Sequence, residues 1–372
     1  MKAGDLWANG GIVATGLFIG VAAALLQWWG NPPNMGVCVA CMERDIAGAL
    51  GLHRVGSVQY LRPEIMGFVF GSLLAALLFR EYRARTGSAP AIRFSLGVFA
   101  MIGALVFLGC PWRALLRLAG GDWNAIVGLL GLCAGIAGGV LFLKSGYNLG
   151  RTYKTKWFAG MILPLIMAAL LLFLLVKPQF GRAKEIVDGV ETIIKTGPIF
   201  FSTTGPGSMY APAALSLLLA VCIGFLAQRT RFCTMGAVRD VILTRDFYLV
   251  SGVAALVIAA FATNLVLKQF NPGWVGQPIA HANHLWNFLG MTLSGLAFAL
   301  AGGCPGRQLI LAGEGDGDAT VFVIGMLVGA GIAHNFNIAS SPAGPGAYGP
   351  IATIAGLLFC VVVGFTMREK FD

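Results

Sequence analysis

Ten apolar runs, each of about twenty residues, constrain this chain more than any other feature. A run of that length is sufficient for an α-helix to cross a bilayer. Charged residues make up only 11% of the 372 residues, against about 25% in an average soluble domain. An outer-membrane barrel would show alternating segments of about ten residues, and the sequence has none. We therefore predict an all-α polytopic membrane protein. The predicted spans centre on 11–29, 64–80, 94–109, 124–143, 157–176, 211–228, 248–267, 285–303, 319–337 and 350–367.

Two pentads, Gly109–Arg113 and Gly303–Arg307, each follow an apolar run and share four of their five residues. Both read Gly-Cys-Pro-x-Arg, with Trp112 in the first and Gly306 in the second. Proline is favoured at the first position of a helix, so each pentad predicts the start of a short helix. Such broken or re-entrant segments are tolerated in a membrane only where they are buried or line a cavity.

The repetition extends beyond the pentads at a nearly constant offset. It aligns Cys38 with Cys233 in two further short segments, and it aligns Arg44-Asp45 with Arg239-Asp240. We predict a first transmembrane repeat over 1–176, an outward-facing linker over 177–209 and a second repeat over 210–372. Each repeat has five spans and two short re-entrant helices.

An odd number of spans per repeat makes the second repeat enter the membrane from the opposite side. The prediction is an inverted repeat with an hourglass-like pathway between the halves. Lysine and arginine are more frequent in the loops on the side of the two chain ends, which places both termini in the cytoplasm.

Pairs of glycines four residues apart recur in four of the predicted spans. This spacing is typical of close helix–helix contacts in membranes, although chance also produces it in a glycine-rich chain. The pairs are Gly16/Gly20, Gly67/Gly71, Gly131/Gly135 and Gly325/Gly329.

Four cysteines form two repeat-related pairs in the short segments, and these are the candidates for a substrate pathway. They are Cys38, Cys110, Cys233 and Cys304. A thiol is a weak hydrogen-bond donor with a soft sulfur atom, which suits a sulfur- or selenium-bearing solute. Cysteines within the spans are interpreted as packing residues; these are Cys133, Cys222 and Cys360.

Cys38-x-x-Cys41 has a spacing typical of redox or metal sites. A zinc site needs about four ligands, and no second Cys-x-x-Cys is present, so we expect no metal. A redox role for Cys38 and Cys41 stays open. Cys41 lies outside the repeated pattern, because Gly236 occupies its equivalent position.

Arginines within a membrane mark a pathway or a paired charge. Arg113 and Arg307 follow the pentad cysteines and are assigned to the pathway. Four further residues form a candidate charge network: Arg44, Asp45, Arg239 and Asp240. Since adjacent helical residues do not face each other, we consider pairing across the repeats, such as Arg44 with Asp240. Anchoring at the lipid headgroups is the alternative.

Several functions are excluded by what the sequence lacks. The net charge of +10 is scattered over short loops, which argues against nucleic-acid binding. No phosphate-binding Gly-x-x-x-x-Gly-Lys-[Ser/Thr] motif and no Ser/His/Asp order are present. We expect no enzymatic activity and no cofactor.

A Cys in an early short helix and a Gly-Cys-Pro-x-Arg after the third span, both in duplicate, resemble the YeeE/YedE sulfur-compound transporter family. The resemblance covers about 11–370 and is strongest to the YedE-type branch associated with selenium metabolism. It implies a multi-pass protein of the bacterial inner membrane that takes up a small sulfur- or selenium-containing anion, such as thiosulfate. It also implies a partner on the cytoplasmic side, a sulfur- or selenium-carrier protein of the TusA type.

In thiosulfate-transporting relatives, cysteines along the constriction pass the anion on by S–H contacts. By motif, Cys110 and Cys304 match the Gly-Cys-Pro positions, and Cys38 and Cys233 match the short-helix positions. Two other functions stay open at this point. One is a membrane thiol oxidoreductase that uses Cys38 and Cys41, and the other is a scaffold that recruits a soluble sulfur carrier.

Overall fold

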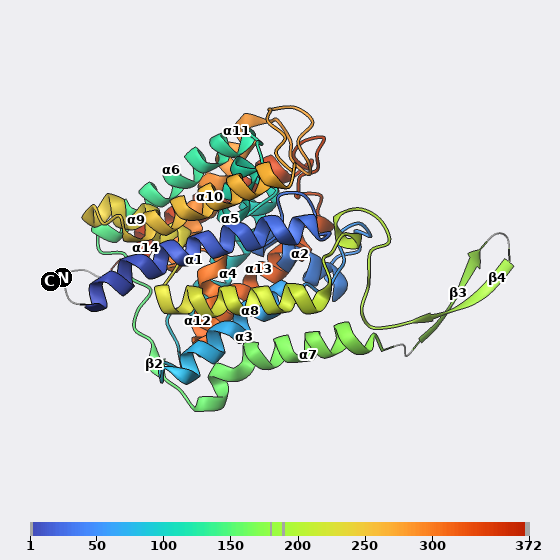
Figure 1. Ribbon diagram of the computed structural model, residues 1–372, viewed down its shortest axis with the longest axis horizontal. Helices are drawn as coiled ribbons and strands as arrows, with labels where there is room; N and C mark the ends of the chain where they lie inside the picture. Colours follow the sequence, from blue (N-terminus) through green and yellow to red (C-terminus); the bar gives the residue numbers. More distant parts are fainter. Residues whose placement is uncertain (1–2, 179–180, 188–189, 369–372) are drawn as a thin grey trace.

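The computed structural model describes residues 3–178, 181–187 and 190–368 (Figure 1). In this part of the chain a long helix occupies each predicted span. These helices are α1 (Ala3–Trp28), α3 (Pro63–Leu78), α4 (Pro90–Phe107), α6 (Asn124–Lys144), α7 (Ile162–Val176), α8 (Ala213–Thr230), α10 (Tyr248–Val266), α11 (His284–Ala301), α13 (Gly317–Asn335) and α14 (Gly349–Thr366). Nine candidate membrane spans meet the criteria of length and hydropathy in the described residues; α3, with 16 residues, is shorter. The all-α polytopic prediction is confirmed.

Four short helices lie where the sequence predicts broken segments. They are α2 (Val39–Ala49), α5 (Pro111–Ala119), α9 (Thr234–Thr244) and α12 (Pro305–Gly313). Proline stands at the start of α5 and α12, where its missing N–H costs no hydrogen bond. The chain turns into α5 through Leu108, whose φ of 64° is left-handed, and into α12 through Gly302 at 85°. These turns separate each short helix from the span before it.

Two small antiparallel ribbons and two 3₁₀ turns complete the described structure. β1 (Arg85–Thr86) pairs with β2 (Tyr153–Lys154), and β3 (Gly181–Val187) pairs with β4 (Val190–Thr196). The 3₁₀ turns are η1 (Trp157–Met161) and η2 (Pro206–Ser208). The β3–β4 hairpin lies in the predicted linker and projects away from the helices at one end (Figure 1). The sequence analysis did not predict this hairpin.

The long helices run roughly parallel to one axis, so the molecule has two opposite faces (Figure 1). We call the face where both chain ends lie the terminal face, and the face with the β3–β4 hairpin the linker face. α1 runs from the terminal face to the linker face, whereas α8, its counterpart by sequence, runs in the opposite direction. The opposite directions support the proposed inverted repeat.

The main helix–helix contacts join a helix of one repeat to a helix of the other. α1 packs against α10, and the equivalent helices of the other repeats, α8 and α3, also pack against each other. In the same way, α4 packs against α13, and their equivalents α11 and α6 pack against each other. Every predicted glycine pair lies at one of these contacts. A Cβ added at Gly16 would come within 1.9 Å of the Gly252 carbonyl oxygen, and one at Gly135 within 2.1 Å of the Thr292 carbonyl oxygen. Close backbone approach across the halves therefore explains the spacing.

Candidate functional site

The four repeated cysteines are the N-cap residues of the four short helices. Cys38 precedes α2, Cys110 precedes α5, Cys233 precedes α9 and Cys304 precedes α12. Cys38 Sγ accepts a hydrogen bond from the backbone N–H of Cys41 at 3.4 Å, and Cys233 Sγ accepts one from Gly236 at 3.2 Å. In both helices the cysteine sulfur accepts from the backbone N–H three residues later. This shared hydrogen bond supports the alignment of Cys38 with Cys233.

In space, the thiols pair within each repeat. The Sγ atoms of Cys38 and Cys110 are 3.8 Å apart, and those of Cys233 and Cys304 are also 3.8 Å apart. All four are free thiols and are at most 6% exposed. Two helix N-termini therefore meet at each pair. The N-terminus of a helix carries a partial positive charge and unpaired N–H groups, which favours an anion there.

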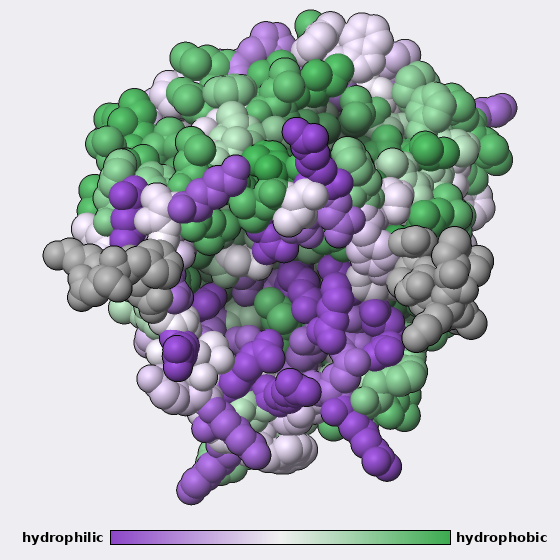
Figure 2. Space-filling model, turned by 90° about the vertical axis from the view of Figure 1, so that its left-hand side faces the viewer, coloured by the Kyte–Doolittle hydropathy of each residue, from purple (hydrophilic) through white to green (hydrophobic). Residues whose placement is uncertain are grey.

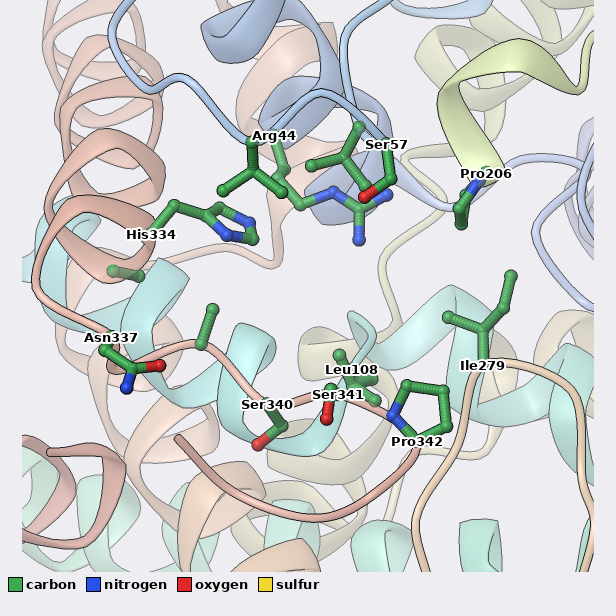
Figure 3. Close-up of a pocket in the computed structure, with 14 residues that line it drawn as sticks. Arg44, Ser57, Leu108, Pro206, Ile279, His334, Asn337, Ser340, Ser341 and Pro342 are labelled. Carbon is green, nitrogen blue, oxygen red and sulfur yellow. The ribbon is translucent and has the colours of Figure 1, made fainter. Parts of the chain in front are cut away.

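A cavity of about 360 Å³ opens at the linker face (Figure 3). Arg44 of α2 and His334 of α13 extend toward its centre, and Leu108 contributes to the wall. Leu108 is two residues before Cys110, but no cysteine lines the cavity. The cavity therefore reaches Leu108 but does not include the Cys38–Cys110 pair.

A buried ion-pair network fixes the Arg44 side of this cavity. Asp45 holds two arginines, Arg44 at 2.7 Å and Arg62 at 2.7 Å. Arg62 also donates to the backbone carbonyls of Pro206 at 2.8 Å and Met209 at 2.9 Å. Since Pro206 belongs to η2, the network ties the end of the linker to α2.

Arg113 is fully buried beside the first thiol pair. It donates to the backbone carbonyls of Leu108 and Ile279, the latter at 3.1 Å, and to Cys41 Sγ at 3.7 Å. No carboxylate pairs with it in the described residues. Arg113 is therefore a buried cation that is held by neutral groups, next to Cys41.

The terminal face has its own cavity, of about 390 Å³. Cys233 lines it directly, together with Arg231, Arg239 and Arg307. Figure 2 views this face and shows polar residues gathered around a hollow, with apolar residues above. Glu314 binds Arg231 at 3.0 Å and Arg307 at 3.3 Å, so part of the positive charge is balanced.

Aromatic side chains lie between the two thiol pairs. The Trp112 ring contacts the rings of Phe68 and Phe232 edge to face, with centroids 5.6 and 5.8 Å apart. Trp112 is two residues after Cys110, and Phe232 immediately precedes Cys233. The described residues thus provide two cavities, two thiol pairs, and an aromatic cluster formed by residues that neighbour a thiol of each pair.

Comparison with protein-family models adds a match described as sulphur transport, over residues 229–364. This region contains Cys233, Cys304 and Arg307. The thiosulfate transporter TsuA of Spirochaeta thermophila is 32% identical over 104 residues, which are 27% of this chain and 29% of that protein. Both matches are consistent with the resemblance of this chain to the YeeE/YedE sulfur-compound transporters, and each covers only part of the chain.

Other similarities are to amino-acid permeases. The L-asparagine permeases of Salmonella typhimurium and Escherichia coli are each 30% identical to the chain over 166 residues, which are 38% of this chain and 32% of each permease. The matched parts thus span about a third of the length of these curated relatives. The sulphur-transport match, by contrast, covers residues 229–364, the part of the chain that holds the second pentad.

One sequence-based hypothesis is wrong. Arg44 does not pair with Asp240 across the repeats, because it pairs with its neighbour Asp45, and Arg239 pairs with Asp240 at 2.8 Å. The side chain of arginine is long enough to bend back to an adjacent carboxylate. In α2 this arrangement is reinforced by Arg62, which binds the other oxygen of Asp45.

Sequence reasoning also missed several site residues. Arg62 and Arg231 stand at span boundaries, where an arginine is usually interpreted as a headgroup anchor. The rings of His53 and His334 lie 4.5 Å apart, and His334 borders the linker-face cavity, although the two residues are far apart in the sequence. Cys41, the candidate redox residue, is buried as a free thiol that contacts Arg113. Only its spacing from Cys38 was visible in the sequence.

Proposed function

We propose that this protein carries a small sulfur- or selenium-containing anion across a membrane, along a path between the two repeats. The path leads from the linker-face cavity past Cys38 and Cys110, then past Cys233 and Cys304 to the terminal-face cavity. The observation that carries the proposal is the N-cap position of all four thiols, in two pairs 3.8 Å apart.

The chemistry of the path fits such an anion. Arginines at both cavities attract negative charge, and the paired helix N-termini compensate for part of the hydration that the anion loses. Cys38 and Cys233 accept backbone N–H bonds at sulfur, which leaves their S–H groups to donate. A weak donor on a soft atom binds loosely enough to release the anion to the next pair.

An amino acid fits the path less well. Its ammonium group needs a free carboxylate or several carbonyl oxygens. Three acidic residues beside the cavities, Asp45, Asp240 and Glu314, are already occupied, because each holds at least one arginine. Glu43 of α2 is the carboxylate that an ammonium group could use, but it is fully buried and does not line either cavity. We therefore favour a sulfur or selenium anion over L-asparagine as the substrate.

The experiment is uptake of radiolabelled thiosulfate into proteoliposomes that contain the purified protein. We expect Cys110→Ala and Cys304→Ala to reduce the uptake rate by at least about tenfold, because each removes one of the two thiols of a pair. Cys360→Ala is the matched control, since this cysteine is buried in α14 outside both pairs. Wild-type uptake by both pathway variants would overturn the proposal.

Substrate choice is tested in the same vesicles. Selenite, thiosulfate, sulfite and L-asparagine compete with the labelled anion, and the substrate is the competitor with the lowest inhibition constant. We propose a selenium compound or thiosulfate. If L-asparagine inhibits the uptake more strongly than selenite and unlabelled thiosulfate do, the substrate class is wrong.

Orientation and partner complete the proposal. We propose that the protein lies in the bacterial inner membrane with its terminal face in the cytoplasm, and that a TusA-type carrier receives sulfur or selenium there. The inverted repeats 1–176 and 210–372 then form the two halves of the path. A fluorescent protein fused to the C-terminus should fluoresce, and a periplasmic phosphatase at that position should be inactive. The reverse result would overturn the orientation.

A further inference from the structure

The two pentads differ at a single position, and this position lies between the thiol pairs. Trp112 in the first pentad corresponds to Gly306 in the second. The two residues are in contact, because a Cβ added at Gly306 would lie 2.7 Å from Cζ2 of Trp112 and 2.9 Å from its Cε2. The glycine thus makes room for the indole ring of the other repeat.

The residues in this cluster lie next to three of the four thiols in the sequence. Phe232 precedes Cys233, Gly306 is two residues after Cys304, and Trp112 is itself two residues after Cys110. With Phe68 on another side, the ring is 1% exposed. The ring therefore contacts segments that carry a thiol of each pair.

The indole N–H is the second observation. Nε1 of Trp112 is buried and has no hydrogen-bond partner in the described part of the chain. A buried donor without a partner costs free energy, and a phenylalanine would give a similar ring contact without that cost. The unpaired donor is thus available to an anion at this position.

We propose that Trp112 is the gate of the path and that its indole N–H donates to the anion as it crosses between the thiol pairs. This inference rests on the proposed function. The ring closes the path in this conformation, and its displacement opens the path. The path then has five donors, the four thiol groups and the indole N–H of Trp112. Because only the first repeat supplies the indole, the path is not symmetric between the two repeats.

Three variants test the gate in proteoliposomes. Trp112→Phe keeps a ring but removes the donor, and we expect the uptake rate to fall about tenfold, as for the loss of one hydrogen bond to a charged group. Trp112→Ala removes the barrier, and we expect the labelled anion to leak from preloaded vesicles. Gly306→Ala places a Cβ against the indole and should slow uptake by a similar factor.

The double variant Trp112→Phe with Gly306→Ala separates a gate from a fold defect. Phenylalanine lacks the indole Cζ2, so the added methyl no longer meets it, and the double variant should transport as fast as Trp112→Phe alone. Trp274→Phe, at the linker face, is the control for loss of an indole. If Trp112→Ala does not fold, the Phe and Gly306 variants still decide.

The outcomes distinguish the two proposals. Wild-type uptake in Cys110→Ala and Cys304→Ala overturns the transport path itself. Loss of uptake in those variants, with wild-type rates in Trp112→Phe and Gly306→Ala, overturns the gate alone. Loss in both sets, with the double variant no worse than Trp112→Phe, supports both.

Discussion

The two thiol pairs have the same internal geometry and different access. Cys38 and Cys110 lie 3.8 Å apart and are 0% and 1% exposed, beneath a cavity that no cysteine lines. Cys233 and Cys304 have the same separation, but Cys233 is 6% exposed and lines the terminal-face cavity. The same motif, built twice, is closed on one face and open on the other in this conformation.

The charges near the two pairs differ in the same way. At the linker face, Arg44 and Arg62 are buried with Asp45, and Arg113 is buried among carbonyls. At the terminal face, Arg239 and Arg231 are partly exposed, with side chains 33% and 50% accessible. Buried pairs fix a structure, whereas exposed ones contribute little to stability and attract ions. The difference suggests a rigid linker side and an adaptable terminal side.

The largest expected effect compares Asp122 with Asp316, which align in the two repeats at the same offset as Cys110 and Cys304. Asp122 binds Arg117 at 2.6 Å, and both side chains are fully buried. Asp316 binds Arg85 at 2.7 Å in a more exposed pair and caps α13 by accepting from Asp318 and Ala319. Asp122→Ala should cost about 3–5 kcal/mol because it leaves a buried arginine unpaired. Asp316→Ala should cost roughly 1–2 kcal/mol, from the cap and a weak pair.

Denaturant unfolding in one detergent and lipid mixture measures both losses. Asp122→Asn combined with Arg117→Met removes both charges and should recover most of the stability lost in Asp122→Ala. Equal losses for the two alanine variants would contradict a rigid linker side. They would show that burial does not distinguish the two faces energetically.

A smaller effect is expected for thiol modification. In variants that retain one cysteine, a small anionic methanethiosulfonate should modify Cys233 at least about tenfold faster than Cys110, since reactivity requires access. The arginines that line the terminal cavity also attract the reagent. Excess thiosulfate should slow the reaction at Cys233. Equal rates at the two cysteines would mean that the linker side is open as well.

Much of this arrangement could be predicted from the sequence, because its signals are local. Apolar runs give the spans, proline at the start of α5 and α12 gives the short helices, and glycine spacing gives the contacts between halves. The thiol pairs could not be predicted in the same way. Sequence alignment relates Cys110 to Cys304, but an inverted repeat places equivalent residues in opposite halves, so each thiol meets a different partner.

The ion pairs were missed for a related reason. Whether an arginine is an anchor or a buried partner depends on the loops that cover it, and nothing local to Arg62 indicates that η2 contributes carbonyl groups to it. Trp112 had a visible signal, the single difference between the pentads, but its contact with Gly306 depends on how the halves meet.

The smallest expected effect is the response of the two faces to acid. At the linker face, burial lowers the pKa of His281 below its usual 6.5. Its Nδ1 accepts from the backbone N–H of Asn283 at 3.2 Å, so its Nε2 donates to the Val106 carbonyl at 2.8 Å and the ring is neutral. At the terminal face, the bond from Gln228 and the ion pair with Arg229 lower the pKa of Glu81.

These shifts predict different pH windows. His281 binds a proton more readily in the unfolded chain, so its contribution is complete above about pH 6.5 and declines as pH falls toward its folded pKa, by at most about 1.4 kcal/mol per unit. Glu81 contributes above its unfolded pKa, about 4.3, and its contribution is lost only as pH falls through its lower folded pKa. Between pH 6.5 and 5, therefore, the linker face should weaken first. Hydrogen exchange should increase around 268–283 before it increases around 79–83, and His281→Gln should remove the first change. An earlier change at the terminal face would show that its exposed ion pairs, rather than the buried histidine, limit stability in mild acid.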